Sequence, residues 1–165
     1  MKKTMIIIAL FVVLIFTMSS RTDRDYRASV GYAVPEMSLT TLSDSSLVNL
    51  ADMRGHYVMV NFWAAYDAES RVAAGEYERA MRVFAPEQLR LLQVNLDPSS
   101  RLFREIVRRD GLNEAQQFTV SASHVQAVER AFNLGNGLQS YLIDPKGNIV
   151  AVNPSPQDVA EIIAS

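Results

Sequence analysis

The stretch VNFWAAYDAESRVAAGEYERA, residues 60–80, decides the fold class of this chain. It opens as an apolar strand, passes through a turn, and continues with apolar side chains at the three- and four-residue spacing of a helix. This spacing predicts a helix from Asp67 to Phe84. One face of the helix would hold Ala73, Tyr77, Ala80, Met81 and Phe84. Many folds hold a reactive group at such a turn, yet this one contains no cysteine, histidine or glycine-rich phosphate loop.

Strands and helices alternate on both sides of this stretch. Four strands are expected, at 57–62, 89–96, 140–144 and 148–152. Three further helices are expected, at 101–109, 123–133 and 156–164. The sequence DPKG at 144–147 predicts a tight antiparallel hairpin, because Pro145 presets one turn dihedral and Gly147 tolerates a positive φ. Alternation closed by a hairpin predicts a three-layer α/β domain with a mixed sheet.

Composition limits the size and the partners of the chain. With 165 residues and 48% hydrophobic content, it can build one domain with a substantial core. The formal net charge is -2. No surplus of basic side chains is present to displace counterions from phosphates, which argues against nucleic-acid binding. His56 and His124 lie far apart without metal-ligand spacing around them, so we expect no metal and no other cofactor.

Residues 1–20 predict a targeting segment rather than part of the fold. Two lysines precede an almost wholly apolar run from Met5 to Met18, which is typical of a signal peptide or a membrane anchor. As a helix the run would span about 21 Å, less than the roughly 30 Å hydrocarbon core of a bilayer. Residues 21–30 have the composition of a linker, and 31–165 form the domain. We expect an exported protein, either in the periplasm or membrane-anchored and facing the periplasm.

The chain contains no cysteine. Export usually permits disulfides, so this domain must be held together by its core alone. Every reaction that needs a protein thiolate is also excluded.

Four stretches together resemble a known family. RGHYVMVNFWAAYDAESR (54–71) is similar to the thioredoxin-like proteins of the bacterial cell envelope, the TlpA/ResA type related to the peroxiredoxins of the AhpC/TSA group, in which Val-Asn-Phe-Trp-Ala leads into a Cys-x-x-Cys turn and a helix. GYAVPEMSL (31–39), VNLADMRG (48–55) and AFNLGNGLQSYLIDPKGNIV (131–150) resemble further pieces in the same order. The resemblance covers roughly 31–163 and implies a thioredoxin-like three-layer fold, with a central mixed β-sheet flanked by helices.

The departures from the family pattern fall on its reactive positions. Asp67 and Ser70 stand where the family has its two cysteines, with Ala68 and Glu69 between them. Leu138 stands where the family has a cis-proline facing that motif. Because a cis bond before leucine costs about 3 kcal/mol, the Gly137–Leu138 bond is expected to be trans.

The helix that follows the turn keeps its electrostatic field when the sulfur is lost. The unpaired N–H groups and the dipole at a helix N-terminus lower the pKa of a cysteine there. Asp67 would place a carboxylate in the same field, as an N-cap that contributes about 1 kcal/mol to helix stability. Such a site retains anion stabilisation, but it cannot form or resolve a mixed disulfide. The simplest interpretation of Asp67 is a structural cap.

Two classes of function remain open. The first is a redox-inactive binding or scaffold domain with a protein partner in the cell envelope. Its candidate contact residues are Trp63, Tyr66, Asp67, Asn136, Gly137, Leu138 and Gln139. The alternative role for Trp63 is simple packing at the end of the strand.

The second class is an envelope protein of thioredoxin-oxidoreductase type. It would act in redox homeostasis through an active partner, or use carboxylate acid–base chemistry at Asp67 and Glu69, which requires one of them to be protonated near neutral pH. A Ser-His-Asp hydrolase assembled from Ser70, His124 and Asp67 lacks a nucleophile-elbow motif. The fold alone does not choose between these classes, because function resides in sites.

Overall fold

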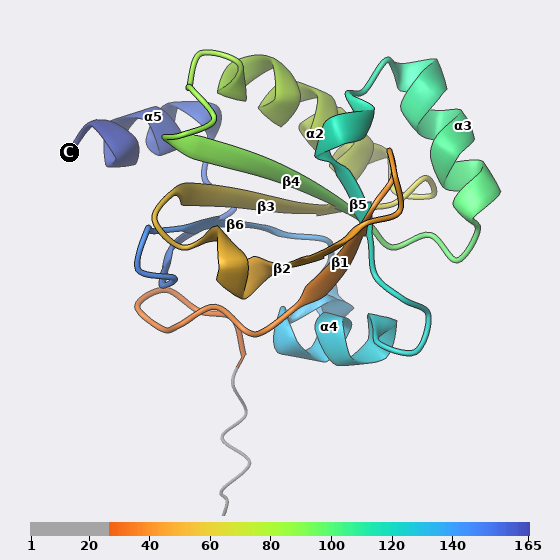
Figure 1. Cartoon of the computed structure of the whole chain (residues 1–165), viewed down its shortest axis with the longest axis horizontal. Coiled ribbons are helices and arrows are strands. Elements are labelled where there is room, and N and C mark those ends of the chain that lie inside the picture. Colours follow the sequence, from red (N-terminus) through yellow and green to blue (C-terminus); the bar gives the residue numbers. More distant parts are fainter. Residues whose placement is uncertain (1–26) are drawn as a thin grey trace, which may run out of the picture.

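The segment around Val60 lies inside a seven-stranded mixed sheet, in a computed structural model that describes residues 27–165 (Figure 1). The strands are β1 (Ser38–Thr41), β2 (Leu47–Asn49), β3 (Tyr57–Trp63), β4 (Leu89–Asn95), β5 (Gln117–Thr119), β6 (Ser140–Ile143) and β7 (Ile149–Val152). Their order across the sheet is β2-β1-β5-β4-β3-β6-β7. The pairs β3–β4 and β4–β5 are parallel, and the remaining pairs are antiparallel. The mixed sheet predicted from the alternation of elements is confirmed.

Helices cover both faces of this sheet, which gives the three layers (Figure 1). The α-helices of the described residues are α2 (Ala68–Met81), α3 (Ser100–Asp110), α4 (Val125–Ala131) and α5 (Pro156–Ala164). Short 3-10 helices are η1 (Leu50–Met53), η2 (Glu114–Gln116) and η3 (Leu134–Asn136). Helices α2, α3 and α5 pack on one face, and α4 with η1 packs on the other.

Strand β3 shows why the sheet is buried on both sides. Alternate residues point to opposite faces of a strand. Val58, Val60 and Phe62 enter the cluster on the α4 side, whereas Met59 and Trp63 enter the clusters beneath α2 and α3. An apolar run in which both sets are buried is typical of a central parallel strand.

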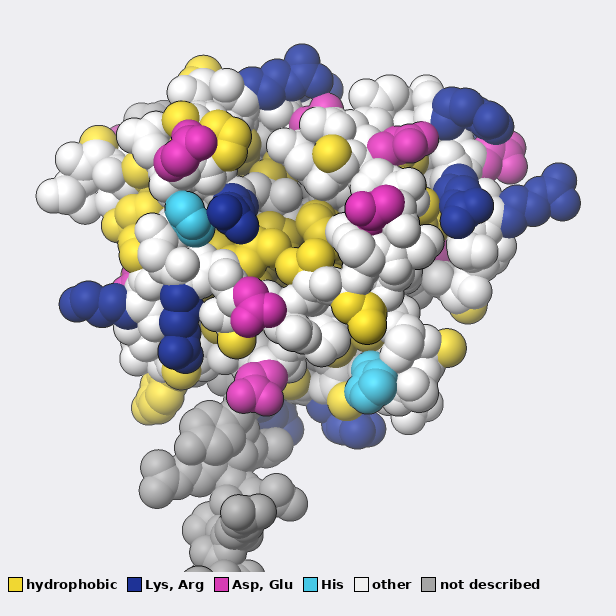
Figure 2. Space-filling view, in the orientation of Figure 1, with side chains coloured by type: hydrophobic (Ala, Val, Ile, Leu, Met, Phe, Trp, Pro, Cys, Tyr) yellow, Lys and Arg dark blue, Asp and Glu magenta, His cyan; other side chains and the backbone are white. Residues whose placement is uncertain are grey.

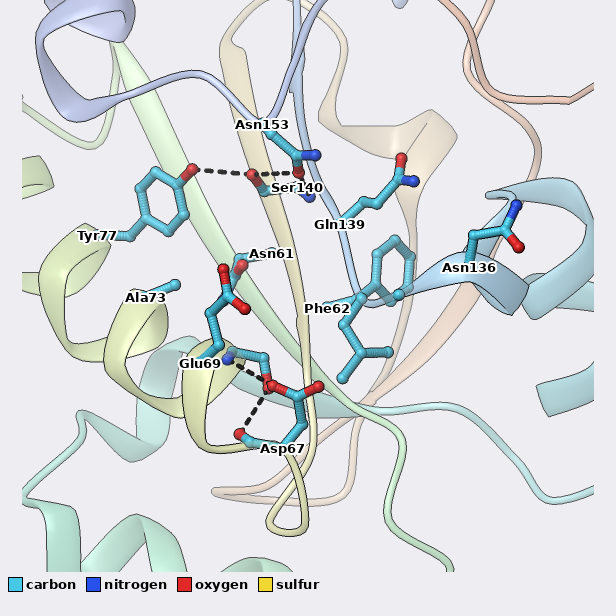
Figure 3. A pocket seen from close by; sticks show the side chains of 13 residues that line it. Asn61, Phe62, Asp67, Glu69, Ala73, Tyr77, Asn136, Gln139, Ser140 and Asn153 are labelled. Atoms are coloured by element: carbon cyan, nitrogen blue, oxygen red, sulfur yellow. Dashed lines mark hydrogen bonds between the residues drawn. The ribbon is translucent and has the colours of Figure 1, made fainter.

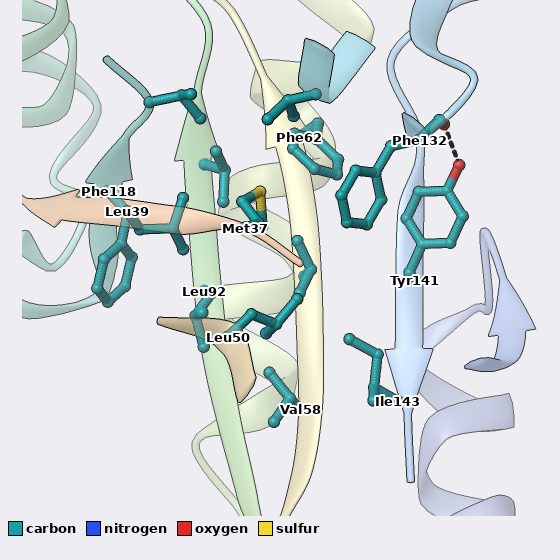
Figure 4. Packing of buried hydrophobic residues seen from close by; sticks show 14 of the residues in the cluster. Met37, Leu39, Leu50, Val58, Phe62, Leu92, Phe118, Phe132, Tyr141 and Ile143 are labelled. Atoms are coloured by element: carbon teal, nitrogen blue, oxygen red, sulfur yellow. Dashed lines mark hydrogen bonds between the residues drawn. The ribbon is translucent and has the colours of Figure 1, made fainter. Parts of the chain in front are cut away.

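The larger cluster lies between the sheet and α4 (Figure 4). Three rings pack in its centre: the Phe62 and Phe132 centroids lie 4.9 Å apart, and the Phe132 and Tyr141 centroids lie 5.4 Å apart. The Tyr141 hydroxyl donates a hydrogen bond to the Phe132 carbonyl. On the outside of the molecule, Figure 2 shows hydrophobic side chains gathered in a hollow in the middle of one face, with charged side chains around it.

The helix predicted from the 60–80 stretch is confirmed as α2. Tyr77 and Met81 are buried in one cluster, and Ala73, Ala80 and Phe84 pack against it from the edge. The apolar face derived from spacing is therefore the packed face. The hairpin is confirmed as well: β6 and β7 are antiparallel, the Gly147 N–H donates to the Asp144 carbonyl at 2.9 Å, and Gly147 has φ +91°.

Three strands were missing from the sequence prediction, namely β1, β2 and β5. Each has only three or four residues, too few for alternation to stand out from background. The predicted helix at 123–133 is also shorter than expected. It is α4, which begins at Val125 and ends at Ala131.

The first 26 residues lie outside the described part of the chain, and with them the predicted targeting segment and most of the predicted linker. The described part already contacts the domain near its start, because the Ala28 N–H donates to the Ala131 carbonyl at 2.7 Å. Between residues 27 and 165, none of the helices has the length and apolarity needed to cross a bilayer.

Candidate functional site

The turn between β3 and α2 is closed by Asp67. This residue has extended backbone geometry (φ -106°, ψ 104°), and its side chain accepts a hydrogen bond from the Ser70 N–H at 2.8 Å. That is the geometry of an N-cap. The predicted capping role of Asp67 is confirmed, and Glu69 adds a second carboxylate in the first turn of the helix.

Ser70 is buried and structural. Its hydroxyl donates to the Asp67 carbonyl at 3.1 Å and accepts from the Ala64 N–H at 3.3 Å. The hydroxyl proton is therefore committed to the turn. His124, which would be the base of a Ser-His-Asp hydrolase, lies beside a different pocket, and its Nδ1 is 2.6 Å from Ser121 Oγ. The structure thus does not assemble a Ser-His-Asp constellation from these residues.

Trp63, one of the predicted contact residues, is buried inside the domain. Its side chain is 0% exposed, its ring packs against Phe103 with centroids 5.7 Å apart, and its indole N–H donates to Gln117 Oε1 at 3.2 Å. A fully buried ring has no surface to offer a partner. The expectation that Trp63 contacts a partner is therefore wrong, and the alternative, packing at the strand end, is the one observed.

Tyr66 lies on the outside of the same turn and is 75% exposed. Partial burial raises the pKa of its hydroxyl, and the negative charges of Asp97, Glu129 and Asp67 raise it further. The surroundings of this ring are thus acidic.

The loop opposite the turn contains Leu138. Gly137 has φ +131° and ψ 155°, a conformation that essentially only glycine adopts. No peptide bond from residue 27 onward is cis, so the expected trans Gly137–Leu138 bond is confirmed. Leu138 is half-buried against the larger core cluster, and the Gln139 carbonyl accepts from the Phe62 N–H at 3.0 Å. The loop is thereby fixed beside the end of β3.

An open pocket of about 420 Å³ separates the turn from this loop (Figure 3). Its lining includes Asp67, Glu69, Ser70 and the loop residues 136–139. These sequence-predicted residues, distant in the chain, are thus brought together. Trp63, Tyr66 and Ala68 are not part of the lining.

Polar residues that the sequence analysis did not assign to the site close one end of the pocket. The Tyr77 hydroxyl donates to the Pro154 carbonyl at 2.6 Å and lies 2.8 Å from Ser140 Oγ. Asn153 Oδ1 accepts from the Ser140 N–H at 2.8 Å. Figure 3 shows this row. Burial raises the pKa of Tyr77. A tyrosine on a predicted apolar face is the one signal that could have revealed the row, because a buried hydroxyl needs a partner.

A second polar row runs beneath α2, across four adjacent strands. Ser140, Asn61, Gln93 and Gln117 lie in register on β6, β3, β4 and β5. All four are at most 3% exposed. Asn61 Nδ2 donates to Gln93 Oε1 at 2.8 Å, and Gln93 Nε2 donates to the Ala74 carbonyl at 2.7 Å. The row begins at the pocket, which Ser140 and Asn61 line.

Comparison with known proteins places this architecture in a family. The model of the AhpC/TSA family matches residues 30–152, most of the chain. The chain belongs to the AhpC/TSA family. The thioredoxin-like fold expected from the resemblance is confirmed, and within the AhpC/TSA family this chain is a member without any cysteine.

Individual relatives agree with this assignment. The thiol-disulfide oxidoreductase ResA of Oceanobacillus iheyensis is 24% identical over 151 residues, which cover 89% of this chain and 77% of ResA. A thioredoxin-like protein from Parabacteroides distasonis is 31% identical, with a TM-score of 0.63 over 67% of this chain and 82% of its own. The thioredoxin domain of a thiol-disulfide oxidoreductase from Bacteroides vulgatus is 22% identical, with a TM-score of 0.73 over 82% and 96%.

Proposed function

We propose that this chain is a redox-inactive member of the AhpC/TSA family that binds a protein partner in the cell envelope. The observation that carries the proposal is the pocket between the 67–70 turn and the 136–139 loop. Hydrogen bonds fix Asp67 and Ser70 in its wall, and these are the residues that the resemblance aligns with the two cysteines of the family. A shaped pocket with two well-fixed walls supports binding. The absence of cysteine from the whole sequence removes disulfide exchange.

The geometry argues against acid–base chemistry at the same turn. A general acid or base needs a carboxylate that is free to reach the substrate. The Asp67 side chain is instead engaged in the turn, where it accepts a hydrogen bond from the Ser70 N–H at 2.8 Å. The Glu69 side chain is exposed to solvent rather than enclosed by the protein. Binding therefore accounts for the site better than proton transfer does.

The envelope location rests on the sequence of residues 1–20. Their basic start and apolar run support export, and a domain without cysteine folds there without forming disulfides. We place the domain in the periplasm, either released or anchored.

Position-specific photocrosslinking in the native envelope tests the proposal. A photoreactive phenylalanine is placed at Tyr66, which is exposed next to the lining residue Asp67, or at Asn136, which is exposed in the loop that lines the pocket. In a control it is placed at Tyr32, which is 64% exposed and does not line the pocket. We expect one shared adduct from the first two positions and its absence from the third. Adducts identical at all three positions, or disulfide-reductase turnover by the purified chain, would overturn the proposal.

A further inference from the structure

The pocket between the turn and the 136–139 loop is lined by two acidic side chains and by no basic one. Asp67 and Glu69 contribute carboxylates, and the remaining lining residues are neutral. Arg71, the arginine that follows on the same helix, is held away by Asp110, whose Oδ2 lies 2.6 Å from Arg71 Nη2. The charge of the two carboxylates is thus not neutralised inside the pocket.

The floor of the pocket adds an oxygen acceptor whose orientation is fixed by the fold. The Ala74 carbonyl can only accept, so the amide nitrogen of Gln93 must face it. Gln93 Oε1 then faces Asn61 and requires a donor, which is Asn61 Nδ2. The carbonyl oxygen of Asn61 is left on the pocket side (Figure 3).

That oxygen has no hydrogen-bond partner among the described residues, although the Asn61 side chain is only 3% exposed. The oxygen is not shut off from solvent, so it is open to the pocket and can accept a hydrogen bond from water or from a ligand. A donor that enters the pocket therefore finds a fixed acceptor in place.

The hydroxyl groups at the other end of the pocket also present acceptors. The Tyr77 hydroxyl donates its only hydrogen to the Pro154 carbonyl. Ser140 must then donate to the Tyr77 oxygen, which lies 2.8 Å away. Neither hydroxyl retains a hydrogen for a ligand.

The positive end of α2 does not reverse the sign of the pocket. A helix N-terminus is equivalent to about half a positive charge, whereas Asp67 and Glu69 together carry two negative charges. The Ser70 N–H is already taken by Asp67. The balance inside the pocket therefore remains negative.

The walls add an apolar component. Phe62, Ala73 and Leu138 line the pocket together with the polar groups. A small hard cation would gain nothing from such walls. A ligand with a short alkyl stem and a cationic head would use both the walls and the acceptors.

We propose that the pocket binds a protonated primary amine on an alkyl stem, such as the lysine side chain of a partner polypeptide. The ammonium group lies among the carboxylates of Asp67 and Glu69 and the carbonyl oxygen of Asn61, and the stem lies along Phe62 and Leu138. This inference rests on the proposed binding function and names the chemistry that the site selects.

Titration of the isotope-labelled full chain by NMR tests the proposal. The probes are N-acetyl-lysine-N-methylamide, n-butylammonium, and the norleucine analogue of the first, which has the same stem without the charge. We expect saturable chemical-shift changes at the pocket residues with both amines, and none with the norleucine probe. Binding of the amines should be weaker at high salt. Tighter binding of the lysine probe than of butylammonium assigns the amine to a polypeptide, and equal binding assigns it to a small free amine.

Matched variants distinguish a loss of binding caused by the missing charges from one caused by damage to the fold. Asp67→Asn keeps a good N-cap, so the double variant Asp67→Asn with Glu69→Gln removes both charges and retains the helix. Its dissociation constant for the lysine probe should rise about tenfold. Glu105→Gln, which removes one exposed acid on α3, should leave that constant unchanged.

The outcomes distinguish this inference from the proposed function. No saturable binding, equal binding of the norleucine probe, or calcium binding at the pocket in place of the amines would overturn the amine site. If the amine site is overturned but the double variant still captures the crosslinked partner, the proposed partner binding stands and only the amine site fails. If the amine binds but no partner is crosslinked, the function proposed above fails instead.

Discussion

At the scale of single residues, Asp67 has a structural role at the position that the family resemblance assigns to a cysteine. Asp67 accepts the Ser70 N–H and stands at the start of α2, so it satisfies a donor that the helix cannot satisfy itself. The carboxylate is stabilised by the same backbone groups that would stabilise a thiolate. The electrostatic field of the turn thus remains, with a group that carries no redox chemistry.

Truncation of Asp67 should destabilise the protein through the loss of this cap. Asp67→Ala is expected to lower the free energy of unfolding by about 1 kcal/mol, whereas Asp67→Asn should cost only a few tenths, because asparagine caps as well as aspartate. Urea denaturation of the two variants measures the difference. Equal losses would show that charge, rather than capping, is what Asp67 contributes.

Tyr141 predicts how stability responds to alkaline pH. Burial raises the pKa of its hydroxyl to about 12, above the value of about 10 in an unfolded chain. Above pH 10 the unfolded state loses this proton first, so the contribution of Tyr141 is complete below pH 10 and is lost as the pH rises toward 12.

The loss should reach about 2 kcal/mol near pH 12. Denaturation at a series of pH values between 8 and 11 measures the slope. Tyr141→Phe is the matched variant, since it removes the titrating group and leaves the ring, and it should be less stable at neutral pH but have a shallower slope. A slope as steep as that of the unmodified chain would mean that other groups cause it.

At the scale of elements, α2 carries both the pocket wall and the packed face. Its start is tied to the end of α3 by the Arg71–Asp110 ion pair. Its middle reaches β6 and the segment after β7 through Tyr77. Gly75, in the middle of α2, does not interrupt the helix, which continues from Ala68 to Met81.

Gly75 is therefore a place where the helix can be strengthened. An added Cβ would lie 3.3 Å from Arg79 Nη1, the far end of an exposed side chain that can move. Gly75→Ala should raise the free energy of unfolding by up to about 1 kcal/mol. Thermal unfolding measures it, with Ala80→Gly as the reverse change on the same helix. A loss of stability would show that Arg79 is held in place more firmly than its exposure indicates.

The elements also show where sequence reasoning succeeds and where it fails. Helix α2 was predictable because its apolar spacing extends over about three turns. Strands β3 and β4 were predictable because each has seven residues in a largely apolar run. The short strands β1, β2 and β5 contain too few residues for a pattern. β1 and β5 join the sheet by pairing with segments distant in the chain, which local spacing does not encode. β2 pairs only with the adjacent β1, at the edge of the sheet.

The same contrast holds at the site. Asp67 could be predicted as a cap, because capping depends on residues adjacent in sequence. The burial of Trp63 could not, because its partners Phe103 and Gln117 come from later elements. The Tyr77–Ser140–Asn153 row likewise joins three separate segments.

At the scale of the whole molecule, three hydrophobic clusters on the two faces of the sheet hold the domain together without a cross-link. The methionines of the described residues all lie in these clusters: Met37, Met53, Met59 and Met81 are at most 8% exposed. Oxidation of methionine follows its exposure. The folded domain thus shields the sulfur atoms that it contains.

Treatment with hydrogen peroxide should leave these four methionines largely unmodified as long as the domain is folded. Mass spectrometry after proteolysis measures the sulfoxide at each position, and the same treatment in urea is the control in which all four should be oxidised. Rapid oxidation of Met59, which is 0% exposed, in the absence of urea would mean that the core opens far more often than its packing indicates.

A pulse of oxidant would find no exposed cysteine or methionine sulfur on the described surface of this domain. Because its four thioethers are buried and its sequence has no thiol, oxidants that attack sulfur leave the surface chemistry of the folded domain unchanged. The partner binding that we propose would therefore not vary with the redox state of its surroundings.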